Sequence, residues 1–120
     1  MTDDKREALR AAIADALDRR RGMRKPLCVK AGMVVAGKQL TVRTIDIGVR
    51  GLSIEADEAL PAQAECHIVF NLPVEGRAHT LRLHATVVHA MRGRAQGYKV
   101  GLALSNVGAQ DLRLIEQFLA

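Results

Sequence analysis

The chain has 120 residues, a length that suits one domain with one core, and 48% of them are hydrophobic, which excludes a mainly disordered chain. The formal charge of +5 favours an anionic partner without identifying it. Five of the 18 Lys and Arg residues lie between positions 19 and 25, and without them 13 basic residues would face 13 acidic ones. The excess of positive charge is therefore local.

The first predicted element is a helix over residues 3–21, where apolar residues recur at helical spacing. Acidic residues open this segment and arginines close it, which complements the helix dipole, and Gly22 is a typical stop signal. We expect residues 1–22 to form an N-terminal helix and the start of a basic strip (residues 19–26). Residues 23–120 form the main domain. The first residues are charged and do not resemble a signal peptide.

Six short strands are predicted after the basic strip, because apolar and polar residues alternate between Gly- and Pro-containing turns. No helix separates consecutive strands, which argues against a parallel sheet and favours a small antiparallel barrel or sandwich. A helix over 109–120 is expected to end the chain. The predicted strands cover residues 27–37, 39–47, 52–56, 65–72, 79–90 and 98–105.

Enzymatic chemistry is not indicated. The sequence contains no phosphate-binding loop, dinucleotide-binding motif, serine-hydrolase elbow or metalloprotease motif. His84 and His89 would point to opposite faces of a regular strand, and no cluster of Asp, Glu or Cys accompanies the histidines, so we predict no catalytic or metal site. Cys28 and Cys66 are expected to be buried thiols in a reduced cytoplasm. No apolar run reaches the roughly 18 residues of a membrane helix.

Two short motifs stand at suggestive positions. The first is Arg20-x-x-x-Arg24 within "RRRGMRKP", and the second is "DIGVRG", Asp46 to Gly51, at a corner between two strands. Each has a structural explanation of its own. The arginines complement the end of a helix, and the glycines supply a positive φ in a turn.

Taken together, the two motifs resemble the signature of the PilZ domain family, an RxxxR element followed by (D/N)xSxxG. Gly48 stands where the family usually has serine. The segments "GLSIEADEALPAQAECHIVFNLP" and "GYKVGLALSNVGAQDLRLIEQFL" also look like the corresponding strands and closing helix of the family. The resemblance covers roughly residues 19 to 119.

The resemblance implies a bacterial cyclic di-GMP receptor built as a six-stranded antiparallel β-barrel with an N-terminal and a C-terminal helix. It implies no cofactor besides the ligand. Arginine suits this ligand, because its planar fork meets phosphate or guanine bidentately and its face stacks on a base. With an arginine at position 19, the chain resembles those members of the family that bind an intercalated dimer of the ligand. The implied ligand-binding residues are Arg19, Arg20, Arg24, Asp46, Gly48 and Gly51.

The leading hypothesis is therefore a receptor whose basic strip becomes ordered on cyclic di-GMP and signals to an unidentified downstream protein. The alternative is a degenerate PilZ-like interaction module that has lost the ligand, an idea that Gly48 supports. Binding of DNA or RNA is not expected, because the chain has only three aromatic residues to serve as stacking platforms. A serine at position 48 is expected to tighten ligand binding by restoring one hydrogen bond.

Overall fold

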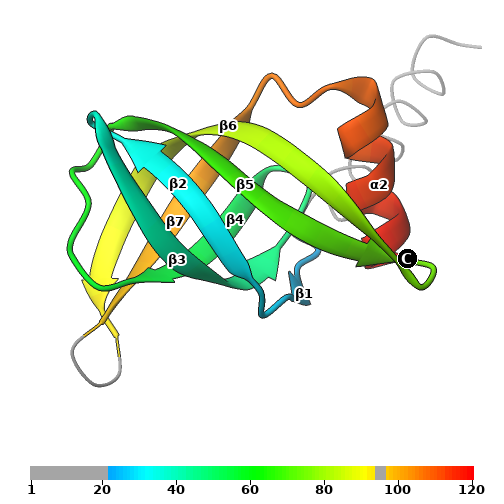
Figure 1. Ribbon diagram of the computed structural model, residues 1–120, viewed down its shortest axis with the longest axis horizontal. Coiled ribbons are helices and arrows are strands. Elements are labelled where there is room, and N and C mark those ends of the chain that lie inside the picture. The colour runs from blue at the N-terminus through cyan, green and yellow to red at the C-terminus, as the bar shows by residue number, and fades with distance from the viewer. Residues whose placement is uncertain (1–21, 94–96) are drawn as a thin grey trace, which may run out of the picture.

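The computed structural model describes residues 22–93 and 97–120, and this part of the chain contains seven strands and a C-terminal helix (Figure 1). The predicted helix over residues 3–21 lies outside the described residues. The elements are β1 (Lys25–Pro26), β2 (Lys30–Val35), β3 (Lys38–Ile47), β4 (Gly51–Ala56), β5 (Glu65–Val74), β6 (Arg77–Arg92), β7 (Tyr98–Ser105) and α2 (Ala109–Leu119).

The strands form one antiparallel sheet that closes into a ring. Their order is β1-β3-β2-β5-β6-β7-β4, and β4 pairs back with β3. Helix α2 lies at one end of the ring (Figure 1) and buries Ile115 in the core. The prediction of a mainly β, antiparallel fold with a C-terminal helix is confirmed.

The structure differs from the predicted first strand, residues 27–37, because it adds strand β1 before that segment, at Lys25–Pro26, and begins β2 only at Lys30. The segment 25–35 does not pair continuously. Its partner is β3, and Thr44 of β3 interrupts the pairing with its buried side chain. The Thr44 hydroxyl accepts a hydrogen bond from Val29 N at 2.9 Å and donates one to Leu27 O. The interruption separates the two-residue β1 from β2 and makes seven strands where the sequence predicts six.

Alternation of buried and exposed residues builds the core from the inner faces of the strands. The longest pairing joins β5 to β6 over ten residue pairs, through a two-residue turn in which Glu75 (φ 52°) and Gly76 (φ 77°) are both left-handed. Such turns match the twist of the strands that they connect. The β2–β3 turn has the same form at Ala36 and Gly37.

Strand β6 is not regular, so His84 and His89 do not lie on opposite faces. The register with β7 shifts between Val87 and His89. A Cβ atom added to Gly101 would meet the His89 ring at 2.3 Å, so that ring lies against the face to which a side chain at position 101 would point. Because Val100 and Leu102 on either side are buried in the core, this is the outer face. His84 is also on the outer face, where its Nδ1 lies 2.7 Å from Ser105 Oγ.

The two cysteines lie in different environments. Cys66 is buried in β5, as predicted, whereas Cys28 is exposed and the prediction of a buried thiol was wrong there. Cys28 belongs to the interrupted segment between β1 and β2, where the alternation continues: Leu27 is buried, Val29 is half-buried against the core, and Cys28 between them faces outward. The alternation of Leu27, Val29 and Ala31 in the sequence is the signal that places Cys28 on the outer face.

Candidate ligand-binding site around Arg24

Arg24 reaches from the basic strip onto the outer face of the ring. Its Nη2 donates a hydrogen bond of 3.0 Å to Ser53 Oγ in β4, and its Nε lies 3.1 Å from Asp46 Oδ1 in β3. Asp46 and Ser53 are directly opposite each other in the antiparallel pairing of β3 and β4. The guanidinium therefore bridges two strands, and one arginine of the first motif contacts the acidic residue of the second.

The carboxylate of Asp46 retains capacity to accept hydrogen bonds. The contact with Arg24 is an ion pair, and within the described residues the buried Oδ1 atom has no hydrogen-bond donor in suitable geometry. Because the ion pair does not meet hydrogen-bond geometry, this oxygen is able to accept a hydrogen bond from a ligand N–H group.

Gly48 and Gly51 allow the strip to lie directly on the backbone of the ring. A Cβ atom at Gly48 would come within 2.7 Å of Met23 O and 2.9 Å of Arg24 Cδ. A Cβ atom at Gly51 would lie 2.5 Å from Arg24 Nη1 and 3.0 Å from Leu102 O. Any side chain at these two positions would push Arg24 away from the surface.

This close approach, and not a special backbone conformation, distinguishes the two motif glycines. Within residues 22–93 and 97–120, the glycines with positive φ are Gly37 and Gly76, both in hairpin turns. The interpretation of "DIGVRG" as a turn requiring positive φ at its glycines was therefore wrong. The corner is closed by a hydrogen bond of 2.9 Å from Gly48 N to Gly51 O, so the Gly48 N–H is already engaged.

Lys25 ties the strip to the C-terminal helix. Its Nζ donates a hydrogen bond of 3.0 Å to Phe118 O and lies 4.7 Å from the centre of the Phe118 ring. Phe118 belongs to the last turn of α2, where carbonyl groups lack partners within the helix and a cation is favourable. No motif in the sequence singles out Lys25, whereas the structure gives it a specific contact with Phe118.

The structure brings together four of the six predicted site residues, and the other two, Arg19 and Arg20, lie outside the described residues. Ser53 is the functional candidate that sequence reasoning missed. It is 6% exposed, is one of the two buried polar residues in the described part of the chain, and contacts Arg24 on the outer face. The available signal is its place in "GLSIEA", where it is the polar residue between two core residues, Leu52 and Ile54.

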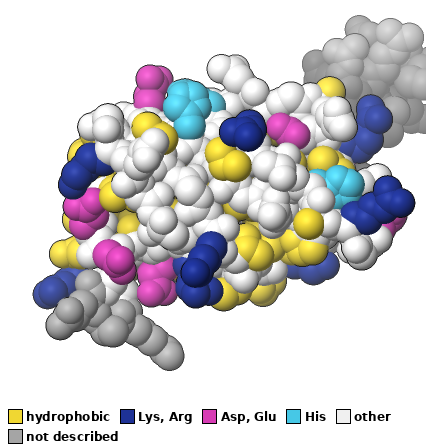
Figure 2. All heavy atoms as spheres, in the orientation of Figure 1, with side chains coloured by type: hydrophobic (Ala, Val, Ile, Leu, Met, Phe, Trp, Pro, Cys, Tyr) yellow, Lys and Arg dark blue, Asp and Glu magenta, His cyan; other side chains and the backbone are white. Residues whose placement is uncertain are grey.

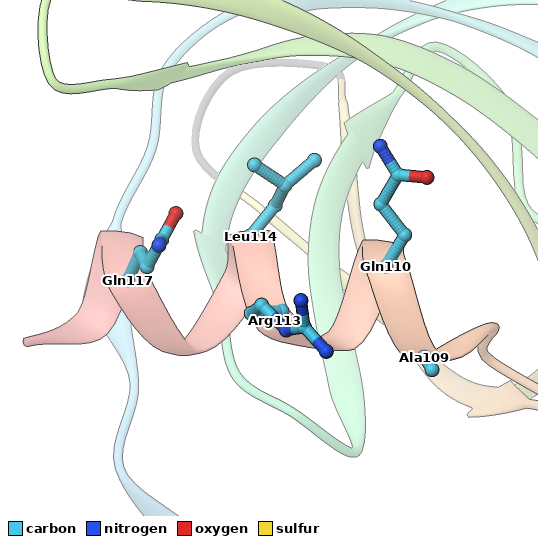
Figure 3. A pocket seen from close by; sticks show the side chains of 5 residues that line it. All are labelled: Ala109, Gln110, Arg113, Leu114 and Gln117. Atoms are coloured by element: carbon cyan, nitrogen blue, oxygen red, sulfur yellow. The ribbon is translucent and has the colours of Figure 1, made fainter.

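Other surface features do not compete with this site. Figure 2 shows basic and acidic side chains interspersed over the visible face, without a large patch of one sign. A cavity of about 440 Å³ runs along α2 and contains none of the motif residues (Figure 3). It is lined by Ala109, Gln110, Arg113, Leu114 and Gln117. Among the described residues, no group of three or more His, Cys, Asp or Glu is placed to hold a metal ion.

Comparison with known proteins gives matches at the level of the family and the fold. The family model described as "PilZ domain" matches residues 18–120. No curated protein matches the chain in sequence. In the described part of the chain, no helix has the length and apolar character needed to cross a membrane.

Three solved structures resemble the chain at low sequence identity. The Bacillus subtilis inhibitor of motility (MotI/DgrA) has a TM-score of 0.72 at 14% identity, with 80% of this chain and 47% of that chain covered. The PilZ domain of CeSA from a cellulose-synthesizing bacterium has a TM-score of 0.57 at 16% identity, with 82% of this chain and 95% of that chain covered. The PlzA protein of Borreliella burgdorferi, solved in complex with c-di-GMP, has a TM-score of 0.59 at 13% identity, with 92% of this chain and 55% of that chain covered. The chain thus spans about half the length of MotI/DgrA and of PlzA.

Proposed function

The chain belongs to the PilZ domain family, a family of cyclic di-GMP receptors, and from this premise we propose that it binds cyclic di-GMP around Arg24. The observation that carries the proposal is the arrangement of Arg24, which lies against Gly48 and Gly51 and pairs with Asp46. Two motifs separated in the sequence thus meet at one place on the outer face of the ring. A cluster that only capped a helix would not need the two glycines beneath the guanidinium.

The proposed ligand contacts follow from the chemistry of the residues. Arg20 and Arg24 bind phosphate or guanine through their planar forks, and Asp46 accepts hydrogen bonds from the N1 and N2 edge of a guanine. Gly48 and Gly51 let the ligand or the arginines approach the backbone. Arg19 adds a cation for a second ligand molecule, so that an intercalated dimer is bound.

We further propose that ligand binding rearranges the basic strip. The present partners of Arg24 are Asp46 and Ser53, and a bound phosphate or guanine competes with both for the guanidinium. A shift of Arg24 is transmitted to the neighbouring Lys25, which holds the last turn of α2. The new arrangement of residues 1–22 against the domain of residues 23–120 then offers a surface to a downstream protein in the cytoplasm.

Calorimetric titration with cyclic di-GMP tests the proposal, with an Arg20→Ala variant and an Arg82→Ala variant run beside the wild type. Arg82 is an exposed arginine of β6, so its loss removes the same charge without touching the site. We expect saturable binding that the Arg20 variant loses and the Arg82 variant keeps. A stoichiometry of two that falls to one in Arg19→Ala supports the ligand dimer.

The second candidate function is an interaction module without the ligand. The observation in its favour is Gly48, which removes the serine hydroxyl that the family motif usually offers. Absence of binding heat from the wild type at high protein concentration would favour this module over the receptor.

A further inference from the structure

Two flat, nitrogen-bearing side chains rest on glycines of neighbouring strands. The Arg24 guanidinium lies on Gly51 of β4, where an added Cβ would meet Nη1 at 2.5 Å. The imidazole of His89 lies on Gly101 of β7, where an added Cβ would meet Cε1 at 2.3 Å and the two ring nitrogens at 2.8 Å. In each case the absence of a side chain lets a planar group lie flush with the backbone.

The strand register makes these two groups neighbours. Asp46 in β3 is opposite Ser53 in β4, Ser53 is opposite Gly101 in β7, and Gly101 is opposite His89 in β6. Adjacent strands lie about 4.8 Å apart. The imidazole on Gly101 is therefore about one strand spacing from Ser53, the residue to which Arg24 donates its hydrogen bond.

The irregularity of β6 has a consequence at this position. In a regular strand, His89 would share the face of Val87, which is fully buried. The register shift after Val87 instead leaves Val88 half-exposed and His89 exposed on the outer face. Irregularities of this kind often re-aim a side chain next to a functional site.

We propose that His89 forms a second wall of the ligand site and stacks on a purine base of the nucleotide whose other groups are held by Arg24. This inference rests on the proposed function and extends the site across β4 and β7 to β6. An imidazole ring offers an aromatic face to a base, and such stacking tolerates any orientation of the base within its plane. Gly101 fixes the height of the ring above the sheet.

The experiment is a cyclic di-GMP titration of the wild type and three variants of this wall. His89→Ala removes the ring, and His89→Phe keeps a flat aromatic face. Gly101→Ala displaces the His89 ring, because the added methyl group would clash with it. We expect about 5- to 100-fold weaker binding for His89→Ala and Gly101→Ala, and near wild-type binding for His89→Phe. His79→Ala is the matched control, because His79 lies ten residues away on the same strand.

The double variant His89→Ala/Gly101→Ala separates displacement of the ring from damage to the sheet. Once the ring is absent, the added methyl group has nothing to displace, so the double variant is expected to bind like His89→Ala alone. Unchanged affinity in His89→Ala overturns the inference while leaving the receptor function intact. Absence of binding by the wild type overturns the receptor function and the inference with it.

Discussion

The β5–β6 hairpin and the basic strip both join the ring by antiparallel pairing, but to very different extents. The hairpin pairs ten residues of β5 with ten of β6 and buries every second residue of β5. The strip pairs only two residues, Lys25 and Pro26, and its described residues 22–26 are all exposed. The hairpin is held by apolar burial, whereas the described residues of the strip are held by a few polar contacts.

This difference indicates which region a ligand is able to move. A partly exposed ion pair such as Arg24–Asp46 contributes about 0–1 kcal/mol, and a hydrogen bond from a charged group about 1.5–3 kcal/mol. Breaking these two contacts of Arg24 therefore costs a few kilocalories per mole at most, which is within the binding energy of a nucleotide. Detaching the hairpin would expose the core and unfold the domain.

The largest expected effect is in the hairpin. Leu81 is fully buried in β6, opposite Phe70 of β5. Leu81→Ala is expected to lower the free energy of unfolding by about 2–5 kcal/mol, because it removes apolar contacts and leaves a cavity. Urea denaturation measures this loss, and exposed Arg82 provides the control Arg82→Ala, for which a change within about 0.5 kcal/mol is expected. Equal effects of the two substitutions would contradict the assignment of the core.

The next effect concerns Cys66, the buried thiol of the hairpin. Burial raises its pKa from 9.0 to about 11. Above pH 9 the unfolded chain releases this proton while the folded chain keeps it, so the free energy of unfolding falls as the pH rises from 9 to 11. The expected loss is on the order of 2–3 kcal/mol, and it is absent below pH 9.

Urea unfolding at pH 8.0 and 10.5, for the wild type and a Cys66→Val variant, isolates this contribution. Valine keeps an apolar side chain of similar size at the site and cannot ionise. Every other group that titrates in this range is common to both proteins, so their effects cancel in the difference. A wild type that loses no more stability than the variant would mean that the thiol is accessible to water in the folded protein.

In the strip, Arg24→Ala is expected to weaken ligand binding while the domain stays folded. Loss of one charged partner weakens cyclic di-GMP binding by about 10- to 100-fold, since hydrogen bonds to charged groups are worth about 1.5–3 kcal/mol. The free energy of unfolding is expected to fall by about 1–3 kcal/mol, because the substitution removes the hydrogen bond to Ser53 and the ion pair with Asp46 but no core contact. Calorimetry and urea denaturation of the same sample compare the two. A large loss of stability would show that the strip is part of the folded core after all.

The sequence predicts the hairpin better than the strip, for a physical reason. Alternation in "HTLRLHATVVHA" is a local pattern that specifies which face of β6 is buried, and the structure confirms it up to Val87. The contacts of Ser53 and Lys25 depend on residues 29 and 93 positions away, so no local pattern reports them. The split between β1 and β2 is likewise caused by Thr44 of another strand.

The smallest effect, a change in affinity of a few-fold, is expected for Gly48→Ser, and its sign tests how the strip moves. In the present arrangement a serine Cβ would lie 2.7 Å from Met23 O, so the strip must shift before any ligand arrives. If ligand binding also moves the strip off Gly48, the clash is present only in the ligand-free protein. The substitution then destabilises the ligand-free state, and in the ligand-bound state the serine hydroxyl is available for a hydrogen bond. Both contributions raise the apparent affinity, in the same way that any mutation favouring the binding-competent state does.

The opposite result, weaker binding by Gly48→Ser, would be equally informative. If the bound strip occupies its present position on Gly48 and Gly51, the serine clashes in the bound state and the affinity falls. Gly51→Ala is the matched variant, because its Cβ would meet Arg24 Nη1 at 2.5 Å as well as Leu102 O at 3.0 Å. Tighter binding by Gly48→Ser supports a strip that leaves the ring on binding. Weaker binding by both variants would mean that Gly48 is adapted to the bound arrangement, in which Arg24 keeps its place.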